Sequence, residues 1–311
     1  GGAFFDLYNI RKPIDWSLSL DDGGRLFTRN GFGTNFNVVA GPVTLGGRAT
    51  FESGGAYSDS YSGDISGTGP LVKSGSDAGL TYLRGTNNAW SGGTLVSNST
   101  LCVAVPGSLP GYATDVLVTN SGCLAFRVGG TDPVAQPGWT AAQIDALVNN
   151  GTTFQSTTAS VGFETAYENL DFTFALPQIG VRKLGPNTLT LSGAGANLGP
   201  VRVFGGTLDL SPVSRYLGDQ GVVVGQSVQT ADPLATLVVG GTAQITTLDR
   251  GYNVAGQPQV VIGDNGRGVM RVSDTAKISG RLLVGNGAAG VGSVRQTGGT
   301  VQNTGGANND G

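Results

Sequence analysis

The stretch that decides the fold is "KLGPNTLTLSGAGANLGPVRVFGGTLDL", residues Lys183–Leu210. It consists of short runs in which apolar and small polar residues alternate, and the runs end at glycine-containing turns. Alternation with a period of two is typical of strands that bury one face. A looser copy begins 110 residues earlier, at Lys73, and ends in "SGGTLVSNSTLCV" (Ser91–Val103). The sequence therefore contains a repeated unit built of strands and turns.

The composition supports a fold that is interrupted by many turns. Glycine accounts for 54 of 311 residues, and charged residues make up only 13 %, against roughly 7 % and 25 % in ordinary globular proteins. Hydrophobic residues reach 39 %, so the chain can bury a core and is not a disordered glycine-rich tail. The net charge of −3 comes without a cluster of Lys and Arg, which argues against nucleic acid as a partner.

Neither a membrane span nor a signal peptide is expected in this chain. It has no apolar run of about 18 residues, and it opens on Gly1 without an initiator Met. We therefore expect a processed or excised piece of a longer protein.

One segment has the pattern of a helix, "GWTAAQIDALVNNG" (Gly138–Gly151). Thr140 and Gln143 have capping-box spacing, Ile144 and Leu147 share a face, and Gly151 offers a stop. The rest of the chain shows strand patterns, so we predict a short helix near 139–150 as an insertion in an all-β fold.

The C-terminal strands repeat at the interval of one coil of a solenoid. Ile262-Gly263 and Val284-Gly285 are 22 residues apart, whereas Val224 precedes Ile262 by 38, which fits nearly two coils or one coil with a long loop. Short strands between glycine turns cannot bury their apolar face alone, but stacked coils bury it in a shared interior. We predict four segments: an apolar and aromatic N-terminal segment 1–40, a β-helix with the first repeat at 41–135, an insertion with the helix at 136–170, and a β-helix with the second repeat at 171–311.

The two repeats resemble the autotransporter-associated β-strand repeat, also called the passenger-associated transport repeat. In the second copy the matching positions include Lys183, Gly185, the run Thr188–Gly193, Asn197 and the run Gly206–Leu208. The first copy matches more loosely, at Asn87, Gly92, Thr94 and Leu95. The resemblance covers about residues 40–210. It implies a right-handed parallel β-helix in an exported bacterial protein at the cell surface or released from it.

The sequence contains few groups that could perform catalysis. Without histidine neither a Ser-His-Asp nor a Cys-His nucleophile can be assembled, and no His-ligated metal site can form. Glu164 and Glu168 could approach each other only on a helix, and Asp21-Asp22 before Gly23-Gly24 is a turn signal that could also bind Ca²⁺. We expect no catalytic residues, no cofactor and no metal site beyond this weak Ca²⁺ candidate.

Cys102 and Cys123 are 21 residues apart, close to one coil, and each alternates with apolar residues that we expect to point inward. We therefore predict that both lie on the outer face of adjacent coils. Neighbouring parallel strands bring Cα atoms within the range of a disulfide, so they form either a bridge between coils or two reduced surface thiols.

The apolar N-terminal strand suggests an assembly contact, because strand edges at the ends of a solenoid must be capped, covered or paired. Its candidate contact residues are Phe4, Phe5, Leu7, Tyr8 and Ile10. The sequence thus favours a non-catalytic extracellular rod whose partner is a second copy of itself, assembling into a surface fibre or filament. Two alternatives are a passenger-type adhesin and a β-helix that binds or cleaves cell-surface glycans.

Overall fold

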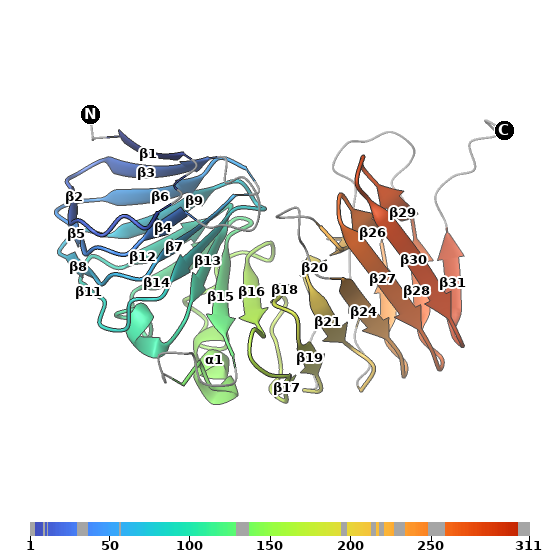
Figure 1. Cartoon of the computed structure of the whole chain (residues 1–311). Helices are drawn as coiled ribbons and strands as arrows, with labels where there is room; N and C mark the ends of the chain where they lie inside the picture. The colour runs from blue at the N-terminus through green and yellow to red at the C-terminus, as the bar shows by residue number, and fades with distance from the viewer. Residues whose placement is uncertain are drawn as a thin grey trace. The chain divides into compact units, whose positions relative to one another are not determined.

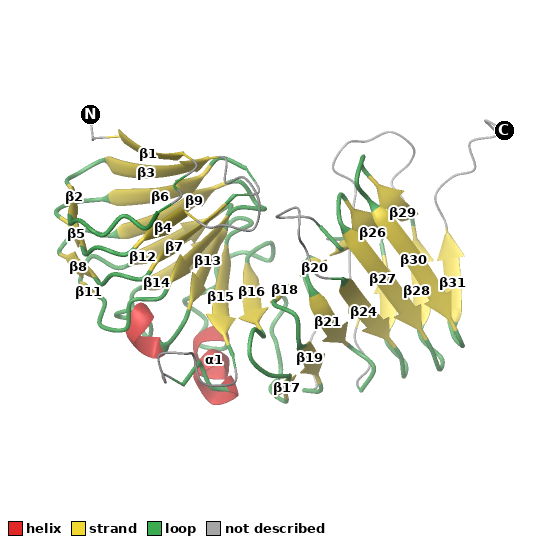
Figure 2. Ribbon diagram, in the orientation of Figure 1, coloured by secondary structure: helices red, strands yellow, loops and turns green. Residues whose placement is uncertain are grey.

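The computed structural model describes residues 4–8, 10, 12–29, 37–55, 57–128, 137–193, 198–212, 216–217, 221–226, 234–247 and 259–303. These residues fall into two compact units, one that ends at Tyr167 and one that begins at Glu168. Strands dominate both units, as Figures 1 and 2 show.

The first unit is a coil whose successive strands visit three sheets in turn. The first sheet has the order β1 (Phe4–Tyr8), β3 (Gly24–Arg29), β6 (Ala49–Ser53), β9 (Leu71–Gly75), β12 (Thr94–Ser97) and β14 (Val116–Thr119). The second contains β4 (Asn37–Val39), β7 (Ser58–Tyr61), β10 (Leu80–Leu83), β13 (Thr100–Val103), β15 (Cys123–Arg127) and β16 (Ser160–Glu164). The third contains β2 (Leu18–Leu20), β5 (Val43–Leu45), β8 (Ile65–Gly67) and β11 (Ala89–Trp90).

The second unit repeats this plan with its own strands. One sheet has the order β17 (Leu170–Phe172), β19 (Thr188–Leu191), β21 (Gly206–Asp209), β24 (Ala235–Val239), β27 (Arg267–Val272) and β30 (Val291–Gln296). The next contains β18 (Gly180–Leu184), β20 (Val201–Val203), β23 (Val222–Val224), β26 (Val260–Asp264) and β29 (Leu282–Asn286). The last contains β22 (Tyr216–Leu217), β25 (Gln244–Thr246), β28 (Lys277–Gly280) and β31 (Thr300–Asn303).

Parallel pairing carries each apolar row from one coil to the next. In the second unit Leu189, Leu208, Leu237 and Met270 are paired in sequence and all are fully buried. Because side chains alternate across a strand, every second residue joins such an inner row. The parallel β-helix that the sequence predicts is therefore confirmed in both units.

The coil length is also confirmed, and the structure explains the irregular interval. Ile262 pairs with Val284, 22 residues later. Val224 pairs directly with Ile262, so the 38-residue interval is a single coil, and its connections from β23 to β24 and from β25 to β26 are both longer than the corresponding ones of the next coil. Connections can lengthen in this way because the ladder constrains only the strands.

The predicted helix is α1 (Ala141–Val148), inserted between β15 and β16. Thr140 Oγ1 accepts a hydrogen bond from Gln143 N, and the Gln143 side chain accepts one from Thr140 N, which completes the capping box. Ile144, Leu147 and Val148 face inward. A single-turn 3₁₀ helix, η1 (Pro106–Ser108), lies before β14.

Candidate interaction surface at the N-terminal edge

Strand β1 turns one face to the interior and one to solvent. Leu7 is completely buried and Phe5 is half-buried, whereas Phe4 and Tyr8 are 57 % and 53 % exposed. Phe4 and Tyr8 lie on the same side of the strand, and exposed apolar patches on a soluble protein often mark interaction sites. Leu7 is part of the core and cannot contact a partner. Of the contact residues in β1 that the sequence predicts, Phe4 and Tyr8 are the exposed ones.

The neighbouring strand β3 places two arginines among these rings. β1 pairs with β3 so that Phe4 lies opposite Arg25 and Tyr8 opposite Arg29. The guanidinium carbon of Arg25 lies 5.6 Å from the Phe4 ring centroid and 5.3 Å from that of Phe27, and the carbon of Arg29 lies 5.8 Å from that of Tyr8. These are cation–π distances. We call these five residues the aromatic–arginine face.

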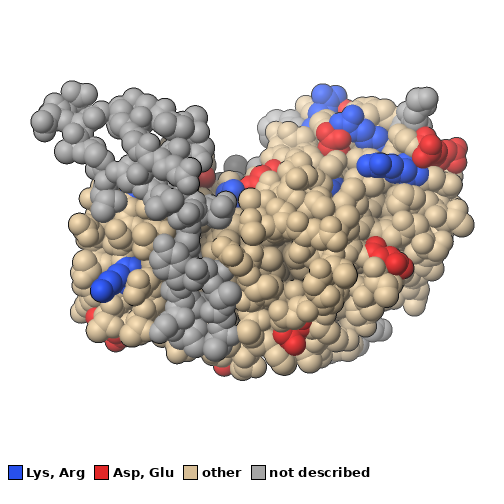
Figure 3. Space-filling model, turned by 180° about the vertical axis from the view of Figure 1, so that it is seen from behind, with Lys and Arg blue, Asp and Glu red and all other residues tan. Residues whose placement is uncertain are grey.

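Two carboxylates neutralise the arginines of the aromatic–arginine face. Arg25 forms an ion pair with Glu52 on β6. Arg29 Nη2 lies 2.5 Å and Nε 2.7 Å from Asp6 Oδ2, and this hydrogen bond raises the pKa of Arg29. Figure 3 shows charged side chains gathered over the N-terminal strands on a surface that is otherwise mostly uncharged. The aromatic–arginine face therefore exposes aromatic rings together with two guanidinium groups, and the positive charges of these groups are balanced by Glu52 and Asp6.

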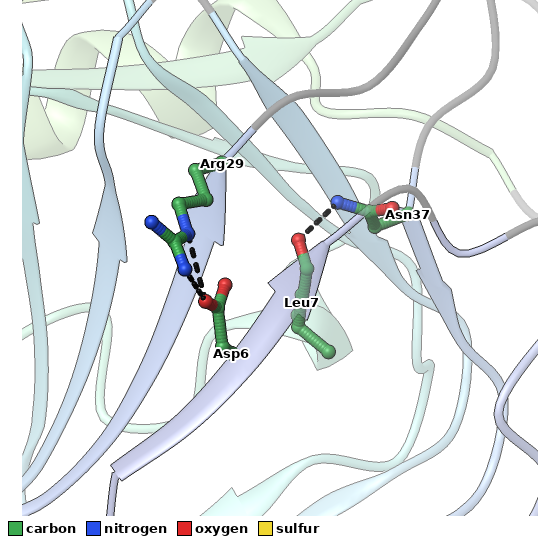
Figure 4. Close-up of polar contacts among 4 residues, drawn as sticks. All are labelled: Asp6, Leu7, Arg29 and Asn37. Atoms are coloured by element: carbon green, nitrogen blue, oxygen red, sulfur yellow. Dashed lines mark hydrogen bonds and ion pairs between the residues drawn. The ribbon is translucent and has the colours of Figure 1, made fainter.

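A buried asparagine fixes the end of β1. Asn37 Nδ2 donates to the Leu7 carbonyl at 2.9 Å, and Asn37 Oδ1 accepts from Ile10 N at 2.8 Å. Figure 4 shows this contact beside the Asp6–Arg29 pair, the two lying on either side of the strand. Because Asn37 lies on β4, it ties β1 to the second sheet and limits how far the strand can move.

Sequence reasoning found the aromatic strand but missed the arginines and the contact between this strand and Trp16. Trp16 is half-exposed, and its ring meets Phe5 edge-on with centroids 5.7 Å apart. The signal for the arginines was present in "RLFTR" (Arg25–Arg29), where cations and a ring recur at every second position. Only the register between β1 and β3 shows that Arg25 and Arg29 stack on the aromatic rings of β1.

The structure corrects the placement of the two cysteines. Both point away from the inner rows, but both are completely buried and do not lie on the surface. Cys102 pairs with Ala125 and Cys123 with Thr100, so the two are staggered by two residues, and the structure has no bond between their sulfur atoms. Burial raises the pKa of the Cys102 thiol well above its usual value.

The other residues considered for chemistry have structural positions. Glu164 lies in β16 and Glu168 in a bend, so neither is on a helix. Asp22 Oδ1 accepts from Arg48 N at 3.2 Å and the Asp21 carbonyl accepts from Gly24 N at 2.8 Å, as in a turn. Within the part of the chain that the structure describes, no three Cys, Asp or Glu residues are grouped as metal ligands would be, and no helix has the length and apolarity to cross a membrane.

A buried polar cluster lies inside the first unit. Asp59 accepts hydrogen bonds from Thr28 Oγ1 at 3.0 Å and Thr81 Oγ1 at 2.5 Å, and Lys73 Nζ donates to Ser53 Oγ at 2.6 Å. All five side chains are buried. Burial lowers the pKa of Lys73 to about 8, although Asp59 and Glu52 oppose the shift. Such groups cost stability unless they are well partnered.

Together these features define a parallel β-solenoid protein with an exposed aromatic and arginine face. The chain is similar to the adhesin BmaC autotransporter of Brucella suis biovar 1 (strain 1330), with 29 % identity over 197 residues. The match covers 58 % of this chain and 6 % of that protein's length, so the chain corresponds to a small part of it. No family model and no solved structure matches the chain.

Proposed function

We propose that this chain is a segment of a passenger-type adhesin at the surface of a bacterium, with no catalytic role. The observation that carries the proposal is the combination of a parallel β-solenoid in both units with the likeness to an autotransporter adhesin. A solenoid suits this task because each coil contacts only its neighbours, so an extended scaffold can be built from coils with different outer surfaces.

The aromatic–arginine face is the part of the described surface best suited to hold a partner. Aromatic rings and arginine dominate the energetically important centres of protein interfaces, because they bury a large area and keep a polar contact. Phe4, Tyr8 and Arg29 present this chemistry on adjacent strands, and the hydrogen bonds of Asn37 anchor the end of β1. We propose a protein on a host or neighbouring cell as the adhesive partner.

An adhesion assay tests the proposal. Beads coated with the purified chain should be retained on cultured cells well above uncoated beads, and the soluble chain should compete. Replacing Phe4 and Tyr8 by Ser should lower retention at least fivefold, whereas Thr44→Ala, at an exposed position on β5, should leave it unchanged. Retention equal to that of uncoated beads would overturn the proposal.

The same chain should also be incubated with a panel of surface polysaccharides. New reducing ends or unsaturated products would identify a glycan-cleaving β-helix and contradict the non-catalytic assignment. We expect neither, because Glu164 lies buried in a strand and Glu168 in a bend, so the two carboxylates are not held on one helix as a catalytic pair would be.

A further inference from the structure

The outer face of β27, in the second unit, carries two exposed arginines. The strand turns Gly268, Met270 and Val272 to the interior, so Arg267 and Arg271 point to the opposite side, because side chains alternate along a strand. Both are exposed although β27 lies between β24 and β30 (Figure 1). This face is therefore open with a coil on each side of it, and further coils beyond β30 would leave it open as well.

The register of the sheet places a third arginine beside the second. Arg271 pairs with Arg295 on β30. Neighbouring strands lie about 4.8 Å apart, and like charges at directly opposite positions destabilise a sheet. Arg267 lies four residues before Arg271 on the same strand, at a distance of about 13 Å. We call Arg267, Arg271 and Arg295 the arginine triad.

No carboxylate neutralises the arginine triad within the described part of the chain, where its guanidinium groups have neither an ion-pair nor a hydrogen-bond partner. The two nearby carboxylates bond to neutral groups: Asp264 accepts a hydrogen bond from Asn286 Nδ2 at 2.8 Å, and Asp274 accepts one from Gly241 N at 2.9 Å. Residues 259–303 contain five Lys or Arg and two Asp, which gives a net charge of +3, whereas the whole chain carries −3. The triad is thus a local positive site on an acidic protein.

The residues between these arginines indicate which kind of partner the triad suits. The outer positions between them are Val269, which is 9 % exposed, and Ser293, which is half-buried. β27 therefore has no outer ring on which a nucleic-acid base could stack, and no exposed aromatic or large apolar residue of the kind that dominates protein interfaces. Binding here depends on charge-assisted hydrogen bonds, and the guanidinium fork matches the paired oxygens of an oxyanion.

We propose that the arginine triad binds an acidic polysaccharide, with one sulfate or carboxylate group held between Arg271 and Arg295 and a second group at Arg267. An oxyanion shared by two guanidinium groups replaces the repulsion between adjacent strands by two charge-assisted hydrogen bonds. The separation of about 13 Å along β27 suits a linear chain that carries charges at intervals. The triad lies in the second unit and the aromatic–arginine face in the first, so this proposal does not depend on adhesion through that face.

Dextran sulfate tests the proposal, because neutral dextran has the same backbone without the charges. Isothermal titration calorimetry with the full chain at physiological salt should detect binding of dextran sulfate and none of dextran. The net charge of −3 opposes general binding of a polyanion, so the signal reports a local positive site. Carboxymethyl dextran shows whether carboxylates serve as well as sulfates. Binding of neither charged dextran would overturn the proposal.

Two charge-matched variants locate the site. Arg271→Gln combined with Arg295→Gln should weaken binding of the charged dextran at least tenfold. Lys277→Gln combined with Arg281→Gln removes the same charge from the same part of the chain but leaves the triad intact, and it should change the affinity less than twofold. Equal effects of the two double variants would overturn the assignment to the triad; circular dichroism confirms that each variant is folded.

Two other polyanions test the class of partner. A DNA duplex and vesicles that contain an anionic lipid should bind the parent chain at least tenfold more weakly than the charged dextran. Equal or tighter binding of either one would overturn the assignment to a polysaccharide.

Discussion

Lys73 and Lys183, 110 residues apart at the start of the two sequence repeats, both place a completely buried amine inside their solenoid unit. The acceptors differ. Lys183 Nζ donates to the carbonyls of Leu184, Gly185 and Gly205 at 2.7, 2.8 and 3.1 Å. Lys73 Nζ donates to Ser53 Oγ and lies near the carboxylate of Asp59. Both repeats therefore begin with a buried lysine, but the groups that accept hydrogen bonds from its amine differ between the two units.

This difference predicts a pH-dependent stability for the first unit. The pKa of Lys73 is about 8 in the folded chain against 10.5 for an ordinary lysine, so between these values the unfolded chain binds more protons. The free energy of unfolding should therefore rise with pH from about 8 to 10.5, by about 3 kcal/mol relative to a chain without this amine. All three tryptophans lie in the first unit, so urea titrations followed by tryptophan fluorescence measure it.

Lys73→Met supplies the reference at each pH. Tyr61 and Cys102 have raised pKa values because of burial, and their titration lowers stability at high pH in both chains, so it cancels in the difference. A difference between parent and Lys73→Met that stays constant from pH 7 to 10 would contradict the low pKa of the buried amine.

Gly162 is expected to be essential for packing in the second sheet of the first unit. A Cβ at this position would lie 2.4 Å from Ala125 Cβ and 3.0 Å from Cys123 Sγ. Gly162→Ala should cost about 1–3 kcal/mol through overpacking, measured by urea unfolding. Adding Ala125→Gly should recover only part of the loss, because a Cβ at position 162 would still lie 2.8 Å from the Cα of residue 125.

Gly151→Ala separates packing from backbone strain. Gly151 has φ +74°, and a Cβ added there would have no atom within 4 Å, so only conformational strain of about 1 kcal/mol is expected. A larger loss at Gly151 than at Gly162 would contradict the packing explanation.

The repeating parts of this fold could be predicted because they depend on local pattern. Alternation indicated the strands, the 22-residue interval between Ile262 and Val284 indicated the coil, and the capping box at Thr140 indicated the helix. The 38-residue interval after Val224 could not be assigned, since a connection outside the ladder leaves no trace in strand periodicity.

The aromatic–arginine face could not be predicted in full, because its composition depends on the pairing of β1 with β3. The apolar character of β1 was visible, but its inward Leu7 and the arginines opposite Phe4 and Tyr8 follow from the register with β3. The cysteines show the same limit. Alternation placed Cys102 and Cys123 on the outward side, but it could not reveal that this side of β13 and β15 is also buried.

The buried cysteines should resist modification in the folded chain. Cys102 and Cys123 have no solvent exposure, and burial disfavours the reactive thiolate of Cys102. Iodoacetamide should add no label to the native protein and two labels after unfolding without reductant, measured by intact mass. Labels that appear only when reductant is added would instead establish the disulfide that the sequence spacing allows.

Asn37 should control the stability of the N-terminal edge, because it bonds two backbone groups of the segment that follows Asp6. Asn37→Ala leaves the Leu7 carbonyl and the Ile10 amide without the partners at 2.9 and 2.8 Å, and a buried group left unpaired costs about 1–3 kcal/mol. Amide exchange at Ile10 should accelerate together with exchange along β1.

Asn37→Asp distinguishes the two hydrogen bonds. It keeps an acceptor for Ile10 N but cannot donate to Leu7, and it places a carboxylate opposite Asp59 in the adjacent strand. It should therefore destabilise the chain more than Asn37→Ala, because two buried carboxyl groups would then face each other. Ser19→Ala, an exposed change on β2, should have no effect. Unchanged exchange at Ile10 in Asn37→Ala would show that β1 is held by its pairing with β3 and not by this side chain.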